Sequence, residues 1–277
     1  MKLSIITVNK NNAAGLEKTA QSVVTQTFSD FEYIVIDGGS DDGSIDVIRK
    51  YADKITYWVS KPDAGIYNAM NKGIKQAHGD FCLFLNSGDC LIEAETLKNV
   101  FDEITGLAEA GIYYSDVITT DGSKIIYPKD VTVYSLLRNG SINHQNILIR
   151  RSLFFCHGMY NERYKIISDY EFCLKEIWIY KTRFVHLKTM ITLYDMSGIS
   201  STTDYNHETS NMLYDMFIDL VDAMPVFREF RNSIYYDIVT KYGNSKPLNI
   251  FLKIYRFFIK KWRLLQKKLR KMGYFRR

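Results

Sequence analysis

The chain has 277 residues, of which 46% are hydrophobic, 24% are charged and only four are proline. This is the composition of a folded protein with one sizeable core and an appendage, and it excludes a disordered or linker-rich chain. The net charge of +5 is unevenly spread: residues 246–277 contain 12 Lys and Arg and no acid, which leaves 24 basic and 31 acidic residues, or −7, in residues 1–245.

The cysteines and the apolar segments exclude further classes of protein. The four cysteines form neither a CxxC pair nor a regular framework, so we expect reduced thiols in a cytosolic compartment rather than disulfides or a sulfur-bound metal. No run of 18 apolar residues occurs, so no membrane span is expected. The apolar run at residues 3–8 is too short for the core of a signal peptide.

The first 85 residues alternate between apolar, β-branched runs and helical spacing. Strands are predicted at residues 3–8, 33–36, 55–59 and 81–85, and helices at 13–27, 45–51 and 66–77. Ser44 is the expected cap of the second helix, and Gly79 lies where a glycine commonly follows a helix. This alternation predicts a parallel sheet with helices on both faces.

Polar residues follow each of the four predicted strands. They are Asn9, Asp37, residues 60–63 and residues 86–89. Because ligands bind beyond the carboxyl ends of parallel strands, this edge of the sheet is the candidate site.

The rest of the chain is less regular. A hairpin is predicted from residues 112–117 and 124–127, which flank Asp121 and Gly122. A further strand is expected at residues 146–149, a helix at 167–180, and one or two strands within 183–193.

The turn after the first strand reads NKNN, and it lacks the glycines of a P-loop and of the GxGxxG dinucleotide fingerprint. A strand edge that presents carboxylates needs a cation to hold an anionic ligand. A hard divalent metal bound by Asp and by phosphate oxygens meets that need.

Five stretches, in this order and spacing, resemble the family 2 glycosyltransferases with the GT-A fold. They are SIITVNKNN, QSVVTQTF, EYIVIDGGSDDGS, KPDAGIYNAMNKGIKQAHGDFCLFLNSGD and SDYEF. The resemblance covers residues 1–200 and is strongest to bacterial enzymes that build capsule, lipopolysaccharide or exopolysaccharide. It implies an α/β fold with a Rossmann-like, mostly parallel central sheet and helices on both faces.

The resemblance and the charge distribution together predict the domain organisation. We expect a glycosyltransferase domain at residues 1–215, with a nucleotide-sugar-binding half at 1–90 and an acceptor-binding half at 91–215. A C-terminal helical extension is expected at 216–277, with a basic amphipathic helix at 248–272.

The resemblance also implies where the donor binds. The nucleoside is expected at the ends of the first two strands, although Asp37 could alternatively be a turn-forming carboxylate. The diphosphate is expected at the start of the third helix, where free backbone N–H groups favour anions, although Asp63 could equally be the N-cap of that helix. The residues implied are Thr7, Val8, Asn9 and Asp37 for the nucleoside, and Asp63, Gly65, Asn68 and Asn71 for the diphosphate.

Residues 86–89 (NSGD) fall where the family has its DxD metal motif. Asp89 is therefore expected to bind Mg²⁺ or Mn²⁺ against the diphosphate, with Asn86, Ser87 and Gly88 beside the donor. Asn86 and Gly88 stand where the common motif has carboxylates, so the metal shell would carry less charge.

Asp169, in SDYEF, matches the general base of the family, and Glu171 is the reserve. The alternative is that both are favourable charges in the first turn of a helix. His144 and Gln145 match a stretch near the acceptor side in related enzymes. Residues 198–201 are expected to form either a closing loop or a linker.

The resemblance also implies inversion of the anomeric carbon, because a single base opposite a metal-held leaving group suits direct displacement. A hexosyl- or hexosaminyltransferase is therefore expected from the resemblance. The expected donor is a nucleotide-diphosphate sugar, UDP-sugar above all, and the expected acceptor is a glycan or a lipid-linked molecule in cell-surface polysaccharide synthesis. The missing carboxylates at positions 86 and 88 support an alternative of another class, a catalytically silent protein that binds nucleotides or glycans.

Apolar residues recur at helical spacing in the basic tail, on the face opposite its Lys and Arg. They are Ile250, Ile254, Phe257, Phe258, Trp262, Leu265 and Leu269. Such a helix lies in the membrane interface, although an RNA-binding helix or a bundled partner helix are alternatives. The acidic body and the expected lipid-linked acceptors favour the membrane over RNA or a partner helix as the binding partner of the tail. We therefore expect no nucleic-acid partner and a cytoplasmic protein bound peripherally to the inner face of the plasma membrane.

Overall fold

A computed structural model describes residues 1–196, 198 and 206–223. The chain divides into two compact units, Met1–Thr203 and Asp204–Arg277. The predicted basic helix at 248–272 and residues 199–201 of the predicted loop lie outside the described residues.

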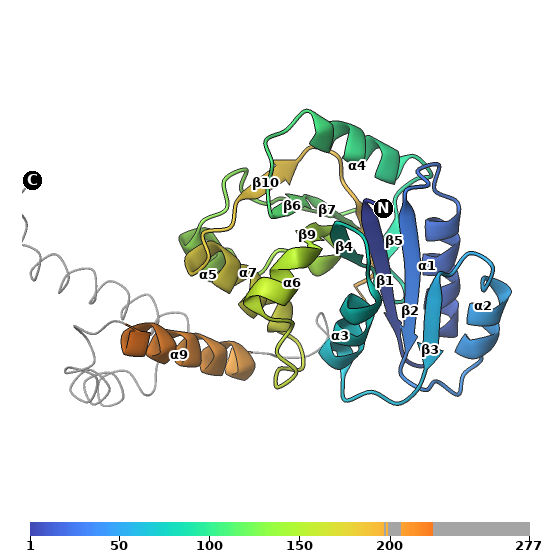
Figure 1. Cartoon of the computed structure of the whole chain (residues 1–277), viewed down its shortest axis with the longest axis horizontal. Helices are drawn as coiled ribbons and strands as arrows, with labels where there is room; N and C mark the ends of the chain where they lie inside the picture. The colour runs from blue at the N-terminus through green and yellow to red at the C-terminus, as the bar shows by residue number, and fades with distance from the viewer. Residues whose placement is uncertain (197, 199–205, 224–277) are drawn as a thin grey trace, which may run out of the picture. The chain divides into compact units, whose positions relative to one another are not determined.

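The first unit is built on a central sheet of seven strands in the order β10-β6-β9-β4-β1-β2-β3 (Figure 1). Neighbouring strands are parallel except where β9 pairs with β4 and β6. The predicted mostly parallel sheet is therefore confirmed. The strands are β1 (Leu3–Asn9), β2 (Phe31–Asp37), β3 (Tyr57–Ser60), β4 (Phe81–Phe84), β6 (Ile112–Ser115), β9 (Ile147–Arg150) and β10 (Phe184–Leu187).

Helices and one 3-10 turn connect these strands. They are α1 (Ala13–Val24), α2 (Ser44–Lys50), α3 (Ile66–Gln76), α4 (Thr96–Thr105), α5 (Val133–Asn139), η1 (His144–Asn146), α6 (Arg151–His157) and α7 (Ser168–Trp178). The helices predicted at 13–27, 45–51, 66–77 and 167–180 are present with shifted ends, whereas α4, α5 and α6 were not predicted.

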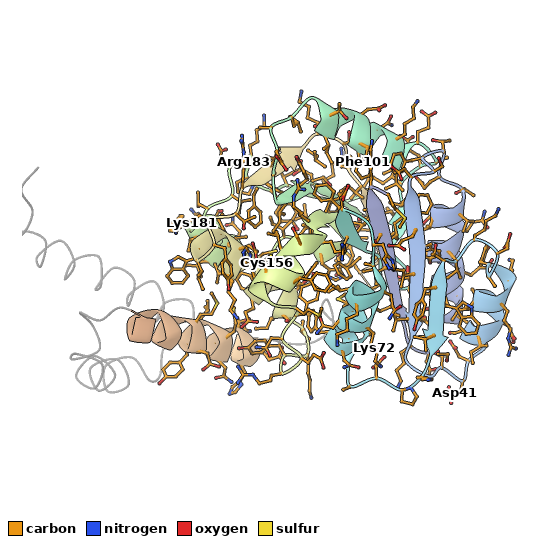
Figure 2. All side chains as sticks on the ribbon, in the orientation of Figure 1. Asp41, Lys72, Phe101, Cys156, Lys181 and Arg183 are labelled. Carbon is orange, nitrogen blue, oxygen red and sulfur yellow. The ribbon has the colours of Figure 1, made fainter. Side chains whose placement is uncertain are left out.

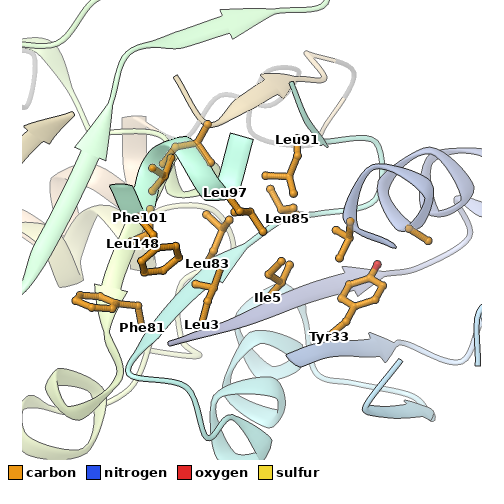
Figure 3. Packing of buried hydrophobic residues seen from close by; sticks show 14 of the residues in the cluster. Leu3, Ile5, Tyr33, Phe81, Leu83, Leu85, Leu91, Leu97, Phe101 and Leu148 are labelled. Carbon is orange, nitrogen blue, oxygen red and sulfur yellow. The ribbon is translucent and has the colours of Figure 1, made fainter. Parts of the chain in front are cut away.

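One face of the central sheet packs against α1 and α4 (Figure 3). The packed side chains are Leu3, Ile5, Leu83 and Leu85 from the strands, Leu16, Ala20 and Val23 from α1, and Leu97 and Phe101 from α4. All of them are buried, so this layer excludes water from the sheet.

The opposite face of the sheet packs against α3 and α6. A Cβ on Gly73 would lie 2.4 Å from Ile6 Cγ2, so α3 approaches β1 closely because residue 73 has no side chain. On α6, the ring of Phe154 meets Phe84 edge-on at 6.0 Å. Helices on both faces confirm the predicted layering.

A second, four-stranded sheet has the order β5-β11-β7-β8. Its strands are β5 (Cys90–Leu91), β7 (Val117–Thr119), β8 (Lys124–Ile125) and β11 (Thr192–Tyr194). The predicted hairpin is partly wrong, because its first strand is split between β6 of the central sheet and β7. Only β7 pairs with β8.

The cap predicted for the second helix is wrong, and for the third helix the structure decides against Asp63 as the N-cap, which the sequence had left as an alternative. Helix α2 already includes Ser44 and is preceded by Gly43, whose φ of +93° is the left-handed region that favours glycine. The Ser44 hydroxyl instead donates to Asp42 Oδ1 at 2.6 Å. The N-cap of α3 is Gly65 rather than Asp63, although Asp63 Oδ1 accepts a hydrogen bond from Gly65 N at 3.0 Å.

Of the second unit, the structure describes helix α9 (Asn206–Ala223). The predicted domain boundary at residue 215 falls inside this helix. No helix among the described residues is both long enough and apolar enough to cross a bilayer.

Candidate active site

The ends of β1, β2 and β3 and the turn after β4 form one hydrogen-bonded edge. Parallel pairing sets Asn9 opposite Asp37, and Asp37 opposite Ser60. Asn9 Nδ2 donates to Asp37 Oδ1 at 2.7 Å, Ser60 Oγ donates to Asp37 Oδ2 at 2.6 Å, and Ser87 Oγ donates to Asn9 Oδ1 at 2.7 Å. The structure therefore brings together four of the strand-end residues that the sequence singled out.

Asp37 is fully buried in this edge. Its carboxylate also accepts the hydroxyl and the backbone N–H of Ser40 at 2.6 and 2.9 Å and the N–H of Gly39 at 3.2 Å. Burial alone would raise the pKa of Asp37, but the hydrogen bonds from Ser40, Ser60 and Asn9 outweigh burial and hold the pKa below its usual value. The carboxylate is ionised and already has five donors, so a nucleoside would bind Asp37 directly only by displacing one of them.

Two other predicted nucleoside residues lie inside the sheet. Thr7 is fully buried and its hydroxyl accepts a hydrogen bond from the Tyr33 hydroxyl at 3.1 Å, while Val8 is also buried. Asp41, which lies in the loop after β2 and is not one of the predicted site residues, points outward into solvent (Figure 2).

The start of α3 uses its polar side chains to hold a loop of the second half. Asn71 Nδ2 donates to Tyr160 O at 2.8 Å and to Glu162 Oε1 at 2.9 Å, and Asn71 Oδ1 accepts from Tyr160 N. Asn68 Nδ2 donates to Glu162 Oε2 at 2.8 Å. These contacts direct both amides towards the loop at 160–162, and binding of diphosphate by these side chains stays a prediction.

The turn at residues 86–89 depends on the conformation of Gly88. Its φ of +113° favours glycine, and a Cβ at this position would lie 2.6 Å from Asp195 Oδ2. The N–H of Asp195 also donates to Asp89 Oδ1 at 3.1 Å. Asp195 thus brings a second carboxylate to the turn. Asp195 was not predicted as a site residue, because the last strands were expected within 183–193, whereas the observed strand β11 ends at Tyr194, directly before Asp195.

Asp89 is buried, with 4% of its surface exposed. Burial raises the pKa of Asp89 to about 6, against the lowering effects of His144 and of the Asp195 N–H. A buried carboxylate of this kind gains from a nearby cation, which would stabilise its charged form.

The oxygen atoms at this turn fit a hard divalent cation. Asp89 and Asp195 supply carboxylates, and Asn86 Oδ1 is buried without a hydrogen-bond partner in the described part of the chain. Mg²⁺ and Mn²⁺ prefer such oxygen ligands and take further ones from phosphates and water. No cluster of three or more His, Cys, Asp and Glu side chains suited to a metal occurs within residues 1–196, 198 and 206–223. A cation here would therefore depend on oxygens of the donor as well.

The predicted base, Asp169, lies in the first turn of α7 and is buried. Its Oδ2 lies 3.0 Å from His144 Nδ1, and its Oδ1 lies 2.9 Å from the Tyr67 hydroxyl. On the other side of the imidazole ring, His144 Nε2 lies 2.9 Å from Asn86 Nδ2. A chain of polar contacts thus connects the turn after β4 to α7.

Burial lowers the pKa of His144, but the hydrogen bond and the charge of Asp169 outweigh burial, so that its pKa lies above the usual value. The neighbouring Gln145 is 1% exposed, and neither polar atom of its side chain has a partner in the described residues. Glu171, the reserve base, lies 2.9 Å from Lys175 one helical turn on and is separate from this chain of contacts.

Comparison with known proteins gives one family. The family model described as "Glycosyl transferase family 2" matches residues 4–167. A PGL/p-HBAD biosynthesis glycosyltransferase of Mycobacterium tuberculosis H37Ra is 33% identical over 205 residues, which are 72% of this chain and 79% of the relative. A cholesterol galactosyltransferase of Borreliella burgdorferi is 32% identical over 103 residues, which are 36% of this chain and 28% of the relative.

Two solved structures share the fold. S. aureus TarS 1–349 in complex with UDP-GlcNAc has a TM-score of 0.65 and 20% identity over 77% of this chain and 64% of that one. The mannosyltransferase PcManGT from Pyrobaculum calidifontis, in complex with GDP-Man and Mn²⁺, has a TM-score of 0.59 and 14% identity over 99% of this chain and 81% of that one. The chain spans 38% of the longer TarS structure.

Proposed function

Because the chain belongs to glycosyl transferase family 2 and has the GT-A fold, we propose that it transfers a sugar from a UDP-sugar, with inversion, to a glycan or lipid-linked acceptor. Glycosyl transfer as such follows from membership of the family. The identity of the donor, the stereochemistry of the transfer and the identity of the acceptor are what we propose.

The contacts of Asp169 carry the proposal. In this mechanism Asp169 Oδ2 takes the proton of the acceptor hydroxyl, the freed oxygen bonds to the anomeric carbon, and the bond from that carbon to the diphosphate breaks. His144 and Asn86 connect Asp169 to the turn expected to face the diphosphate. A base on one side and a leaving group on the other favour direct displacement, which inverts the anomeric carbon.

Asp89, with Asp195 and Asn86 Oδ1 beside it, would hold a Mg²⁺ or Mn²⁺ ion. Such an ion would stabilise the negative charge on the departing nucleoside diphosphate. The Mn²⁺ of the mannosyltransferase complex and the UDP-GlcNAc of the TarS complex support this choice of cofactor and donor class.

A lipid-linked acceptor and a place at the inner face of the plasma membrane are parts of the same proposal. The name of the Borreliella relative gives a lipid, cholesterol, as its acceptor. The tail at 246–277 has 12 basic residues and no acidic residue, which suits an anionic leaflet. Synthesis of a cell-surface polysaccharide would use such an acceptor.

The proposal is tested by turnover of donors without acceptor. UDP-glucose, UDP-galactose, UDP-GlcNAc and GDP-mannose are incubated with Mn²⁺ or EDTA, and release of the nucleoside diphosphate is measured. We expect metal-dependent hydrolysis of at least one UDP-sugar. Asp169→Asn should reduce the rate by about 100-fold or more, because a general base contributes on that order.

Donor binding by Asp169→Asn, followed by thermal shift, should stay close to that of the wild type. Glu171→Gln is the matched control, because it removes a carboxylate two residues away that pairs with Lys175; its rate should be nearly normal. Stabilisation of the wild type by a donor, with no turnover at any metal concentration, would instead identify the silent binding protein.

A further inference from the structure

We propose that His144 is a positioning residue that orients the Asp169 carboxylate towards the acceptor hydroxyl, an inference that rests on the proposed role of Asp169 as base. The sequence suggested a substrate contact for His144. The structure instead places both ring nitrogens against protein groups.

Within the described part of the chain, the hydrogen bonds of Asp169 leave one direction open. Its Oδ1 faces the Tyr67 hydroxyl at 2.9 Å and accepts the N–H of Tyr170 at 2.8 Å. Its Oδ2 faces His144 Nδ1 at 3.0 Å. A carboxylate oxygen accepts about two hydrogen bonds, so one position on Oδ2 remains for the acceptor hydroxyl. His144 determines which way that position points.

The imidazole ring is itself fixed from the other side. Its Nε2 lies 2.9 Å from Asn86 Nδ2, in the turn that carries Asp89. The side chain of His144 is 14% exposed and that of Asp169 is 12% exposed, so little water competes for the contact between them. The contact with Asn86 therefore helps to hold the ring in place, while Nδ1 faces the base on α7.

Two further histidine–carboxylate pairs in the described residues show that such a contact alone does not make a histidine a positioning residue for the base. His157 Nδ1 lies 2.8 Å from Glu176 Oε1, and His186 Nε2 lies 2.9 Å from Asp116 Oδ1. Neither pair includes a residue of the turn at 86–89 or Asp169. His157 therefore provides a matched control for the loss of a partly buried histidine–carboxylate contact.

Three substitutions of His144 distinguish the contribution of its Nδ1 from that of its Nε2. In His144→Asn the amide nitrogen can take the place of Nδ1 and still donate to Asp169, whereas His144→Gln places its amide near the former Nε2. His144→Ala removes both groups. We expect His144→Asn to keep donor hydrolysis within about threefold of the wild type, and the other two to lose about 10- to 100-fold in kcat, since a misplacement of about 1 Å has that effect.

The donor KM should stay within about twofold of the wild type in all three variants, because His144 acts on the base and not on the donor. His157→Asn and His157→Gln should leave kcat unchanged. Adding His144→Ala to Asp169→Asn should cause no further loss, since two residues that act as a unit are not additive. Equal losses in His144→Asn and His144→Gln, or a loss confined to KM, would overturn the proposal.

The outcomes distinguish the role of Asp169 as base from the role of His144 as positioning residue. If Asp169→Asn retains full turnover, the proposed base is wrong; if it is inactive while His144→Ala is fully active, only the role of His144 is wrong. An NMR spectrum of ¹⁵N-histidine-labelled protein tests the contact between His144 and Asp169 without any substrate. The proton on His144 Nδ1, assigned by its loss in His144→Ala, should shift in Asp169→Asn, and an unchanged resonance would refute the contact.

Discussion

Asp37 shows how a buried carboxylate can organise a strand edge. It accepts hydrogen bonds from two neighbouring strand ends and from the loop that follows β2. Because hydrogen bonds to an ionised group are stronger than neutral ones, this network holds three separate segments in a fixed arrangement. The shape of the predicted nucleoside site therefore depends on the charge of Asp37.

Replacement of Asp37 by Asn should reduce stability at pH 7 by about 2 to 3 kcal/mol, because an amide accepts fewer hydrogen bonds than a carboxylate and turns its own donors towards Ser40. The pKa of Asp37 is lower in the folded state than its ordinary value of 3.8, so the stabilisation is complete above that pH and is lost as the pH falls through the folded pKa. Urea denaturation between pH 7 and pH 3 should show the difference between variant and wild type shrinking with acid.

Asp46→Asn is the control for this measurement, since Asp46 is exposed on α2 and its side chain pairs with the exposed Arg49. Its free energy of unfolding should stay close to that of the wild type at every pH. A constant difference between Asp37→Asn and the wild type across the range would show that charge on Asp37 contributes nothing.

At the scale of residues, Asn9, Asp37, Asn86 and Asp89 were indicated because each follows a predicted strand. Asp169 was indicated by the resemblance of SDYEF to the family stretch that contains the general base. The convergence of the strand-end residues depends on parallel pairing, which the alternation of strands and helices predicts. Tyr67 and Asp195 could not be found in this way. Their roles arise from contacts across about 100 positions in the chain, with Asp169 and Asp89.

At the scale of elements, the start of α3 joins the two halves of the first unit. Asn71 is 4% exposed and makes three hydrogen bonds to the loop at 160–162, which precedes α7. Since Tyr67 on the same helix contacts Asp169, α3 positions both the loop and the base.

Asn71→Ala should therefore reduce the free energy of unfolding by roughly 2 kcal/mol, because it leaves the buried N–H and C=O of Tyr160 without their side-chain partner. Urea denaturation measures the loss. Asn68→Ala, which removes hydrogen bonds to Glu162 and Ala64 from a less buried position, is the control and should lose about 0.5 kcal/mol. Donor affinity measured on folded Asn71→Ala tests the predicted contact with diphosphate: a loss of affinity would support that contact, and normal affinity would refute it.

Helix length alone does not separate the predicted helices from the missed ones. The seven-residue α2 was predicted, whereas the seven-residue α5 and α6 and the ten-residue α4 were not. A helix of seven residues completes about two turns, so its hydrophobic stripe is only a weak signal. The strand β9 was expected from its apolar residues, but its antiparallel direction is determined by its neighbours β4 and β6. The sequence of a strand does not by itself indicate with which strands it pairs or in which direction.

At the scale of the whole molecule, charge separates the chain into an acidic part and a basic tail. Residues 1–245 have a net charge of −7, and the 12 basic residues of the tail have no acidic neighbour within 246–277. An acidic body is repelled by an anionic surface, so any attraction to such a surface must come from the tail.

The tail should bind the full-length protein to anionic vesicles. A basic residue near an anionic leaflet contributes about 1 kcal/mol, so six of the 12 facing lipid would give about 6 kcal/mol, enough for reversible adsorption. In sedimentation, the full chain should bind vesicles that contain phosphatidylglycerol, and high salt should release it. A chain that ends at Lys246 should stay in the supernatant.

A full-length variant with Gln at positions 260, 261, 263, 267 and 268 separates charge from apolar contact. Those five positions hold Lys or Arg, and the apolar residues of the tail are unchanged in the variant. Binding should fall strongly if the tail is attracted by lipid charge, and it should persist if only the aromatic residues insert. Equal binding of vesicles by the truncated and full chains would show that the tail does not bind the membrane. Salt-sensitive binding of RNA, without binding of vesicles, would show that the tail binds nucleic acid instead. Because the neutralised variant keeps the whole tail, a loss of binding cannot be attributed to a missing segment.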